Sequence, residues 1–119
     1  MDEKQIQARR REICVELMAL GPMRRGCVIE QEVESVHPDG TRTRRGPYPL
    51  LTMKEKGKTV SRRLKDDEEV RRMREEIARF RRFEELTAEL RRLGEALCAL
   101  VDDGVKKKRR RSPSSGTRR

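Results

Sequence analysis

The chain has 119 residues, of which 33% are hydrophobic and 44% are charged, with no Trp, one Tyr and two Phe. This length predicts a single domain, and so little apolar surface cannot build a thick core around a catalytic cleft. The net charge of +10 predicts a polyanionic partner. Residues 104–119 carry eight basic and no acidic side chains, so the end of the chain supplies most of this charge.

Residues 1–20 predict an N-terminal helix, because apolar side chains recur there at helical spacing. Glycine and proline at positions 21 and 22 would end it. The predicted apolar stripe consists of Ile6, Ile13, Leu17 and Leu20, with Cys14 and Met18 beside them.

The three cysteines, Cys14, Cys27 and Cys98, lack the spacing of a zinc or redox motif, and the only histidine is His37. We therefore expect reduced, buried thiols, no metal site and no cofactor. The charged N-terminus lacks the apolar core of a signal peptide, and no apolar run reaches transmembrane length. These features predict a cytoplasmic protein that does not contact a membrane.

Residues 21–65 change to an alternating period and predict a β-hairpin region or a small three-stranded antiparallel sheet. In residues 27–36 an apolar row alternates with an acidic row, which predicts a half-buried strand. The apolar row is Cys27, Ile29 and Val33, and the acidic row is Glu30, Glu32 and Glu34. Residues 37–40, His-Pro-Asp-Gly, predict a turn, after which the basic residues 41–46 would pair back only briefly.

A second hairpin is predicted around Lys56-Gly57, a two-residue loop between residues 49–54 and 59–64. With this loop Met53 faces Val60, although a slip of one residue would invert both faces. The apolar face then holds Pro49, Met53, Val60 and Leu64, and the opposite face holds Leu50, Thr52, Lys54, Thr59, Ser61 and Arg63. Lys54, Thr59, Ser61 and Arg63 of the second set suit contacts with bases in a DNA groove. Because an acidic row on the same face would repel phosphate, we favour a charge-balanced solvent face.

Residues 66–103 predict a long amphipathic helix with a coiled-coil-like heptad seam that slips in phase near Phe83. Such a helix is about 55 Å long, roughly twice the length of the N-terminal one. The expected consequence is a homo-oligomer, most simply a dimer, that buries the remaining seam. The predicted interface residues are Val70, Met73, Ile77, Phe80, Leu86, Leu90, Leu93 and Leu97.

Residues 104–119 predict a disordered basic tail, because no apolar residue follows Val105 to offset the entropy of ordering. Its cations would bind phosphates by counterion release, without sequence preference. The predicted nucleic-acid contacts are Lys106, Lys107, Lys108, Arg109, Arg110 and Arg111, followed by Arg44, Arg45 and Lys58, with Arg42, Lys54, Arg62 and Arg63 as further candidates. A merely solubilising tail is the alternative, and in a eukaryote the same run would be typical of a nuclear import signal.

Four sequence landmarks, in this order, resemble a family of small uncharacterised bacterial proteins, many of them encoded beside transposase-like genes. The landmarks are Met-Arg-Arg-Gly at 23–26, Gly-Pro-Tyr-Pro-Leu at 46–50, Lys-Gly-Lys-Thr-Val at 56–60 and Arg-Phe-Arg-Arg-Phe-Glu-Glu-Leu at 79–86. The family has a short cysteine cluster before the Gly-Pro-Tyr element, whereas residues 37–45 of this chain contain none. The resemblance implies a bacterial, mobile-element context, with a transposase as a protein partner, and no particular mechanism.

Together these patterns predict an α+β fold, mostly α, in a single domain over residues 1–103. We expect no catalytic residues, because the chain lacks a glycine-rich phosphate loop and any paired Ser–His or Cys–His motif. The function we favour is a non-enzymatic accessory protein that associates with nucleic acid. The alternative is a protein–protein adaptor that recruits or regulates a larger enzyme through its long helix, and a gene remnant is a third reading. Composition does not distinguish DNA from RNA as the ligand.

Overall fold

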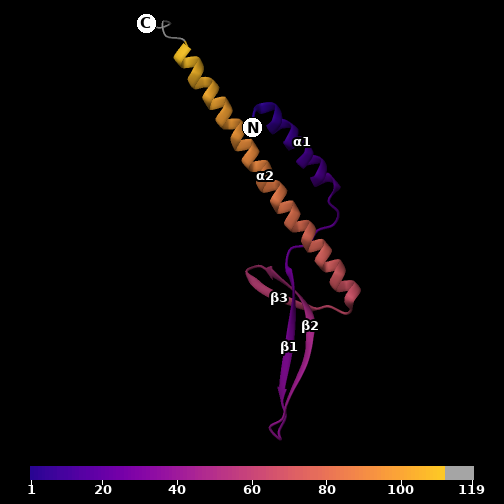
Figure 1. Ribbon diagram of the computed structural model, residues 1–119. Coiled ribbons are helices and arrows are strands. Elements are labelled where there is room, and N and C mark those ends of the chain that lie inside the picture. The colour runs from indigo at the N-terminus through magenta and orange to yellow at the C-terminus, as the bar shows by residue number, and fades with distance from the viewer. Residues whose placement is uncertain (112–119) are drawn as a thin grey trace. The chain divides into compact units, whose positions relative to one another are not determined.

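The computed structural model describes residues 1–111, with side chains as far as Lys108 (Figure 1). The elements in chain order are α1 (Glu3–Ala19), β1 (Cys27–Val36), β2 (Arg42–Glu55), β3 (Lys58–Arg63) and α2 (Asp67–Arg111). This confirms the predicted α+β class with mostly helical content. The chain groups into two compact units: a sheet unit, Leu20–Arg82, and a helical unit that combines Met1–Ala19 with the described part of Phe83–Arg119.

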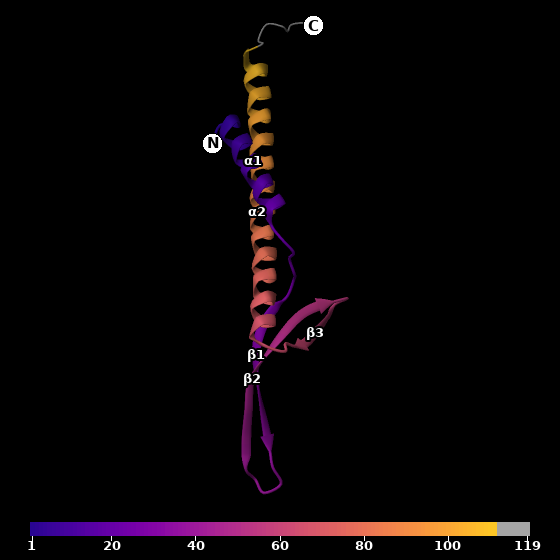
Figure 2. The same ribbon diagram turned by 90° about the vertical axis from the view of Figure 1, so that its right-hand side faces the viewer.

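The three strands form one antiparallel sheet in the order β1-β2-β3, and β1 has the bounds predicted for it. Strand β2 is longer than predicted. Residues 42–45, expected to pair only briefly, pair with residues 33–36 of β1, so that this hairpin extends beyond β3 (Figure 2). The turn closes it tightly, because His37 N donates to Thr41 O at 2.8 Å and Gly40 N donates to His37 O at 2.9 Å.

The β2–β3 hairpin has the predicted register. Met53 pairs with Val60, and Leu64 N donates to Pro49 O at 3.0 Å. Lys56 and Gly57 have φ angles of 50° and 82°, which are the positive values that a two-residue hairpin turn requires. Here the turn sequence and the apolar pattern specify the same alignment.

One face of the sheet packs on the first turns of α2 and forms the core of the sheet unit. Leu51, Leu64, Met73 and Ile77 are buried, with Val28, Met53 and Val70 packed against them. The apolar face predicted for the second hairpin is therefore confirmed at Met53 and Leu64, whereas Val60 on the same face remains 42% exposed.

The predicted inward row of β1 was wrong. Val28 faces the core because it pairs with Leu51, so the alternation directs Cys27, Ile29 and Val33 to the other face. Ile29 and Val33 keep 44% and 43% of their surface exposed. Val28 is the residue of β1 that packs against the core, although more apolar residues of this strand lie in the other row.

In the helical unit, α1 lies beside the later turns of α2 in both views (Figures 1 and 2). Ile6, Ile13, Leu86 and Leu93 are buried there. The guanidinium of Arg9 also donates to both carboxylate oxygens of Glu89, at 2.6 and 2.8 Å. The predicted stripe of α1 is thus only partly right, since its side residues do not contribute to the core.

The predicted burial of the thiols was also wrong, because Cys14 and Cys98 are exposed and Cys27 is half-buried. Met18, placed beside the stripe, is 87% exposed. It lies about 140° round the helix from Ile13, because successive residues of an α-helix are about 100° apart. The buried stripe of α1 is accordingly narrower than predicted.

Half of the predicted oligomer interface is instead buried within the single chain. Met73 and Ile77 lie under the sheet, and Leu86 and Leu93 are buried in the helical unit. For these four residues the prediction is wrong, because the sheet covers one stretch of the seam and α1 covers another. The other four predicted interface residues, Val70, Phe80, Leu90 and Leu97, are half-buried.

Helix α2 continues past its predicted end at Asp103 and runs through Gly104 to Arg111. One glycine costs a helix only about 1 kcal/mol relative to alanine. The lysines and arginines that follow are good helix formers, and the helix dipole favours cations at this end. The predicted tail is therefore helical over residues 104–111, and the prediction for 112–119 lies outside the described residues. Within the described chain, no helix has both the length and the apolar character needed to cross a membrane.

Candidate nucleic-acid interface

The strand register assigns each side chain of the sheet to one of two faces, because directly paired residues point the same way. Leu51 pairs with Val28 and with Arg62, so these three lie on the face that packs on α2, which we call the helix-side face. The opposite face is called the outer face. Its residues are Cys27, Ile29, Gln31, Val33 and Ser35 of β1, Thr43, Arg45, Tyr48, Leu50, Thr52 and Lys54 of β2, and Thr59, Ser61 and Arg63 of β3.

The two faces differ sharply in charge. Every carboxylate of the three strands, namely Glu30, Glu32, Glu34 and Glu55, lies on the helix-side face. The outer face carries three cations, Arg45, Lys54 and Arg63, and no carboxylate. The expectation that the acidic row would share a face with Lys54 was therefore wrong, because Glu30 pairs with Pro49 and points to the helix side.

A bulge in β2 completes this sorting of charge. Between Gln31 and Val33 of β1, the partner residues advance from Tyr48 to Arg45, so β2 has one extra residue. Gly46 lies in the bulge with φ of 110°, and a Cβ there would come within 2.8 Å of Gln31 O. The extra residue directs Arg45 to the outer face and Arg44 to the acidic side of β1.

The helix-side cations face carboxylates. Arg42 lies 3.4 Å from Glu34, and Arg44 lies 4.0 Å from Glu32. On β3, Lys58 is paired in the ladder with Glu55. These partners reduce the field that Arg42, Arg44 and Lys58 present to a polyanion.

Arg62, a further predicted phosphate contact, also lies on the helix-side face. Its guanidinium is 3.5 Å from the carboxylate of Glu69 on α2 and 4.0 Å from the sulfur of Met73. Arg62 therefore links the sheet to the helix.

Arg44, Arg45 and Lys58, the nucleic-acid contacts that were predicted within the sheet, do not form one patch. Arg44 and Arg45 lie on opposite faces of β2. Lys58 lies beside Glu55, ten residues further along β2 than Arg45, which is about 30 Å at roughly 3.3 Å per residue. Of these three, only Arg45 is on the outer face.

The outer face offers hydrogen-bonding groups beside its cations. Thr52 pairs with Ser61 and Lys54 pairs with Thr59, which aligns three hydroxyls and an ammonium group across β2 and β3. The guanidinium of Arg63 lies 3.8 Å from the centroid of the Tyr48 ring, a cation–π contact that fixes both side chains. Most of these residues were predicted from sequence to share one face. The absence of carboxylates from the strand residues of that face was not predicted.

A second basic region is the end of α2, which we call the basic end and define as residues 106–111. The side chains of Lys106, Lys107 and Lys108 are exposed on the helix. Arg109, Arg110 and Arg111 complete the helix. The predicted tail contacts are thus consecutive helical residues.

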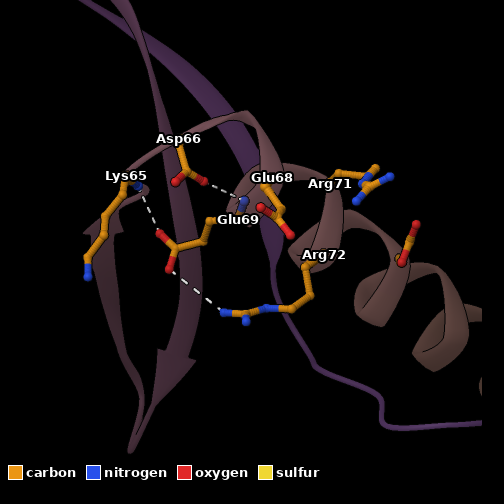
Figure 3. A pocket seen from close by; sticks show the side chains of 7 residues that line it. Lys65, Asp66, Glu68, Glu69, Arg71 and Arg72 are labelled. Atoms are coloured by element: carbon orange, nitrogen blue, oxygen red, sulfur yellow. Dashed lines mark hydrogen bonds and ion pairs between the residues drawn. The ribbon is translucent and has the colours of Figure 1, made fainter.

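The first turn of α2 borders a charged depression (Figure 3), lined by Lys65, Asp66, Glu68, Glu69, Arg71, Arg72 and Glu75. Its central groups serve the helix start. Glu69 N donates to the carboxylate of Asp66, and Lys65 N donates to the carboxylate of Glu69, both at 2.8 Å, so these two carboxylates accept from backbone N–H groups where the helix begins. The N–H of Lys65, followed by Arg62, holds the pKa of Glu69 below its ordinary value despite some desolvation.

Among the described residues, no group of three or more His, Cys, Asp or Glu side chains is placed to hold a metal ion. The carboxylate of Glu69 in the depression beside α2 has hydrogen-bonding and ionic partners of its own.

Comparison with known proteins identifies a family for this chain. The model of a domain of unknown function, DUF6788, matches residues 3–75, well over half of the sequence. The chain belongs to the DUF6788 family. The DUF6788 match includes α1, the whole sheet and the first turns of α2, so both faces of the sheet lie within the family domain and the basic end lies beyond it. No curated protein and no solved structure matched the chain.

Proposed function

We propose that this DUF6788 protein is a non-enzymatic accessory protein that binds the phosphate backbone of nucleic acid through the basic end of α2. The observation that carries the proposal is the run of six consecutive cations on a helix, three of them with exposed side chains within the described residues. Counterion release makes such a cluster a non-specific phosphate ligand.

The helical form of the basic end strengthens this proposal. An α-helix rises about 1.5 Å per residue, so the six cations of the basic end are concentrated on about 9 Å of helix axis. Successive residues of a helix point about 100° apart, so the exposed side chains of Lys106, Lys107 and Lys108 spread over more than half of the helix circumference. The basic end can therefore contact phosphates without a fixed orientation.

Charge removal in the full chain tests the proposal. A variant with glutamine at all six positions 106–111 should bind a random-sequence duplex far more weakly than the wild type. Each lost phosphate contact removes about 0.9 from the slope of log affinity against log salt concentration. Fluorescence anisotropy at several salt concentrations measures both quantities.

A matched control removes six exposed cations from elsewhere on the helices and reaches the same net charge. Suitable positions are Lys4, Arg11, Arg74, Arg81, Arg91 and Arg92, each changed to glutamine. This control should keep most of the salt dependence of the wild type. Equal losses in the two variants would mean that total charge, and not the basic end, governs binding, and the proposal would then be wrong.

The cellular setting proposed with this function is the bacterial cytoplasm, with a transposase-like enzyme as partner. The support for it is the resemblance of residues 21–100 to proteins encoded beside transposase-like genes. Copurification that survives nuclease treatment would identify a direct contact, because nuclease removes a bridge made by nucleic acid alone.

The second candidate function is a protein–protein adaptor. Exposed apolar side chains on the last turns of α2 favour it, since Leu100, Val101 and Val105 are 38%, 65% and 46% exposed. A second copy of the chain that covers them would form the homo-oligomer predicted from sequence, now through this end of α2. Sedimentation equilibrium measures that association, and a variant with serine at 101 and 105 should be shifted to monomer.

A further inference from the structure

We infer that the outer face of the sheet binds duplex DNA by lying in its major groove. This inference rests on the proposed function and deepens it by naming the form of nucleic acid and a second, separate surface. It follows from the charge, the width and the hydrogen-bonding groups of the outer face.

Charge is the first argument. All the net positive charge of the strands is on the outer face, because the helix-side face balances its four cations with four carboxylates. No ion pair within residues 1–108 engages Arg45 or Lys54, whereas Arg42, Arg44 and Arg62 lie within 4.0 Å of carboxylates. A phosphate that approaches Arg45 or Lys54 therefore meets no carboxylate on the same face of the strands. Arg63 and Tyr48, by contrast, border a depression that Asp66 and Asp67 also line.

The dimensions of the sheet fit the groove. Where all three strands lie side by side, at Leu50–Thr52 of β2, the strand axes span about 10 Å, and two strands continue on either side of this stretch. The major groove of B-form DNA is about 12 Å wide. On β2, Arg45 and Lys54 lie near opposite ends, and Arg63 pairs with Leu50 between them. The cations therefore extend along the strand direction, as phosphates extend along the edge of a groove.

The middle of the outer face suits base edges. Thr59 and Ser61 bring hydroxyls that donate and accept, whereas the hydroxyl of Thr52 contacts Cys27 Sγ at 3.0 Å and Cys27 O at 3.4 Å. The guanidinium of Arg63 stacks on the ring of Tyr48. Arginine pairs with guanine in the major groove, and threonine and serine contact either kind of base. Exposed Ile29 and Val33 on β1 offer apolar contact to thymine methyl groups.

The same geometry excludes double-stranded RNA as the preferred ligand. The major groove of A-form RNA is deep and narrow, so side chains cannot reach its base edges. A sheet about 10 Å wide has no comparable fit there. The outer face should therefore separate DNA from RNA, which the basic end alone would not do.

The test compares two full-length variants of equal net charge. Arg45→Gln with Lys54→Gln removes two outer-face cations. Arg44→Gln with Lys58→Gln removes two helix-side cations from neighbouring positions. We expect the outer-face variant to bind a random-sequence DNA duplex about ten-fold more weakly than the helix-side variant, the effect of losing one or two direct contacts.

Two further measurements identify the groove and the nucleic acid. A dye that occupies the major groove should compete with the wild-type protein, and a minor-groove dye should not. On an RNA duplex of the same sequence, the two variants should bind equally. Far-UV circular dichroism of both variants must match the wild type, so that a change in binding is not a loss of the sheet.

The outcomes separate this inference from the proposed function. If the full chain binds DNA but the two variants are equal on it, the outer face is not a DNA surface and the basic end accounts for binding. If RNA shows the same preference between variants as DNA, the assignment to the major groove is wrong. If the wild type binds no nucleic acid at low salt, both proposals fail, and a protein becomes the better occupant of the outer face.

Discussion

The two faces of the sheet are built from the same strands and carry similar numbers of cations, yet they present different surfaces. On the helix-side face Arg42 and Arg44 lie beside glutamates and Arg62 joins α2. On the outer face Arg45 and Lys54 lie on a surface that has no carboxylate. Charge counting along the sequence treats these residues alike. The comparison teaches that register, and not composition, determines which cations a ligand meets.

The largest expected effect is on the free energy of unfolding, and it tests which face of the sheet forms the core. Leu51→Ala should lower the free energy of unfolding by about 2–5 kcal/mol, because Leu51 is 1% exposed in the core of the sheet unit. Leu50→Ala, one residue away on the outer face, should cost about 1 kcal/mol or less. Urea unfolding followed by circular dichroism measures both, and equal losses would contradict the assignment of faces.

A smaller effect concerns the bulge that assigns Arg44 and Arg45 to opposite faces. Gly46→Ala places a side chain at φ of 110° and within 2.8 Å of Gln31 O. Gly57→Ala meets a similar positive φ in open space, so it carries only the backbone cost of about 1–2 kcal/mol. Thermal unfolding should show the larger loss for Gly46→Ala, and the opposite order would mean that the bulge is not needed.

The smallest effect concerns Glu69, which neutralises Arg62 on the helix side. The N–H of Lys65, with Arg62, holds the pKa of Glu69 below its ordinary value. A lowered pKa in the folded state stabilises the fold above the unfolded pKa, about 4.3, and this contribution is lost as the pH falls through the folded pKa.

Glu69→Gln keeps an acceptor for the capping hydrogen bond but cannot titrate. The variant should therefore be slightly less stable at neutral pH and should lose less stability between about pH 5 and pH 3. Glu68→Gln, on the neighbouring exposed residue, is the control for the loss of one negative charge from the first turn of α2. The measurement is the melting temperature as a function of pH, and parallel curves for Glu69→Gln and the wild type would refute the assignment.

The elements of the fold that depend on local signals were predictable from sequence. Residues 27–36 alternate, residues 37–40 form a turn, and Lys56-Gly57 allows the positive φ values of a two-residue loop. Each of these signals lies within a few residues of the turn or strand that it specifies. It can therefore be recognised without knowing which distant segments are in contact. Both helices were predictable from their apolar periods for the same reason.

The features that failed depend on contacts between distant segments. Alternation in β1 defines two rows, but only the pairing of Val28 with Leu51 shows which row faces α2. The seam of α2 was predicted to be an oligomer interface, because the sequence does not show that the sheet covers one part of it and α1 another. The end of α2 was misjudged because Gly104 and the cations after it are compatible with either a helix or a tail.

The candidate interface was predictable in its residue types and not in its grouping. Lys54, Thr59, Ser61 and Arg63 were placed on one face from the loop position alone, and the register agrees. Arg45 joins them only because one extra residue in β2 shifts the alternation. No pattern in the sequence distinguishes Arg44 from Arg45, so the separation of their roles requires the ladder.

The stacked pair Arg63 and Tyr48 has an optical consequence. Tyr48 is the single tyrosine of a chain without tryptophan, so it dominates the intrinsic emission of the protein. Its ring lies on the outer face under the guanidinium of Arg63, 3.8 Å away. Any ligand that draws Arg63 off the ring changes the surroundings of this one fluorophore. The intrinsic fluorescence of Tyr48 can therefore report the binding of a ligand to the outer face without an added label.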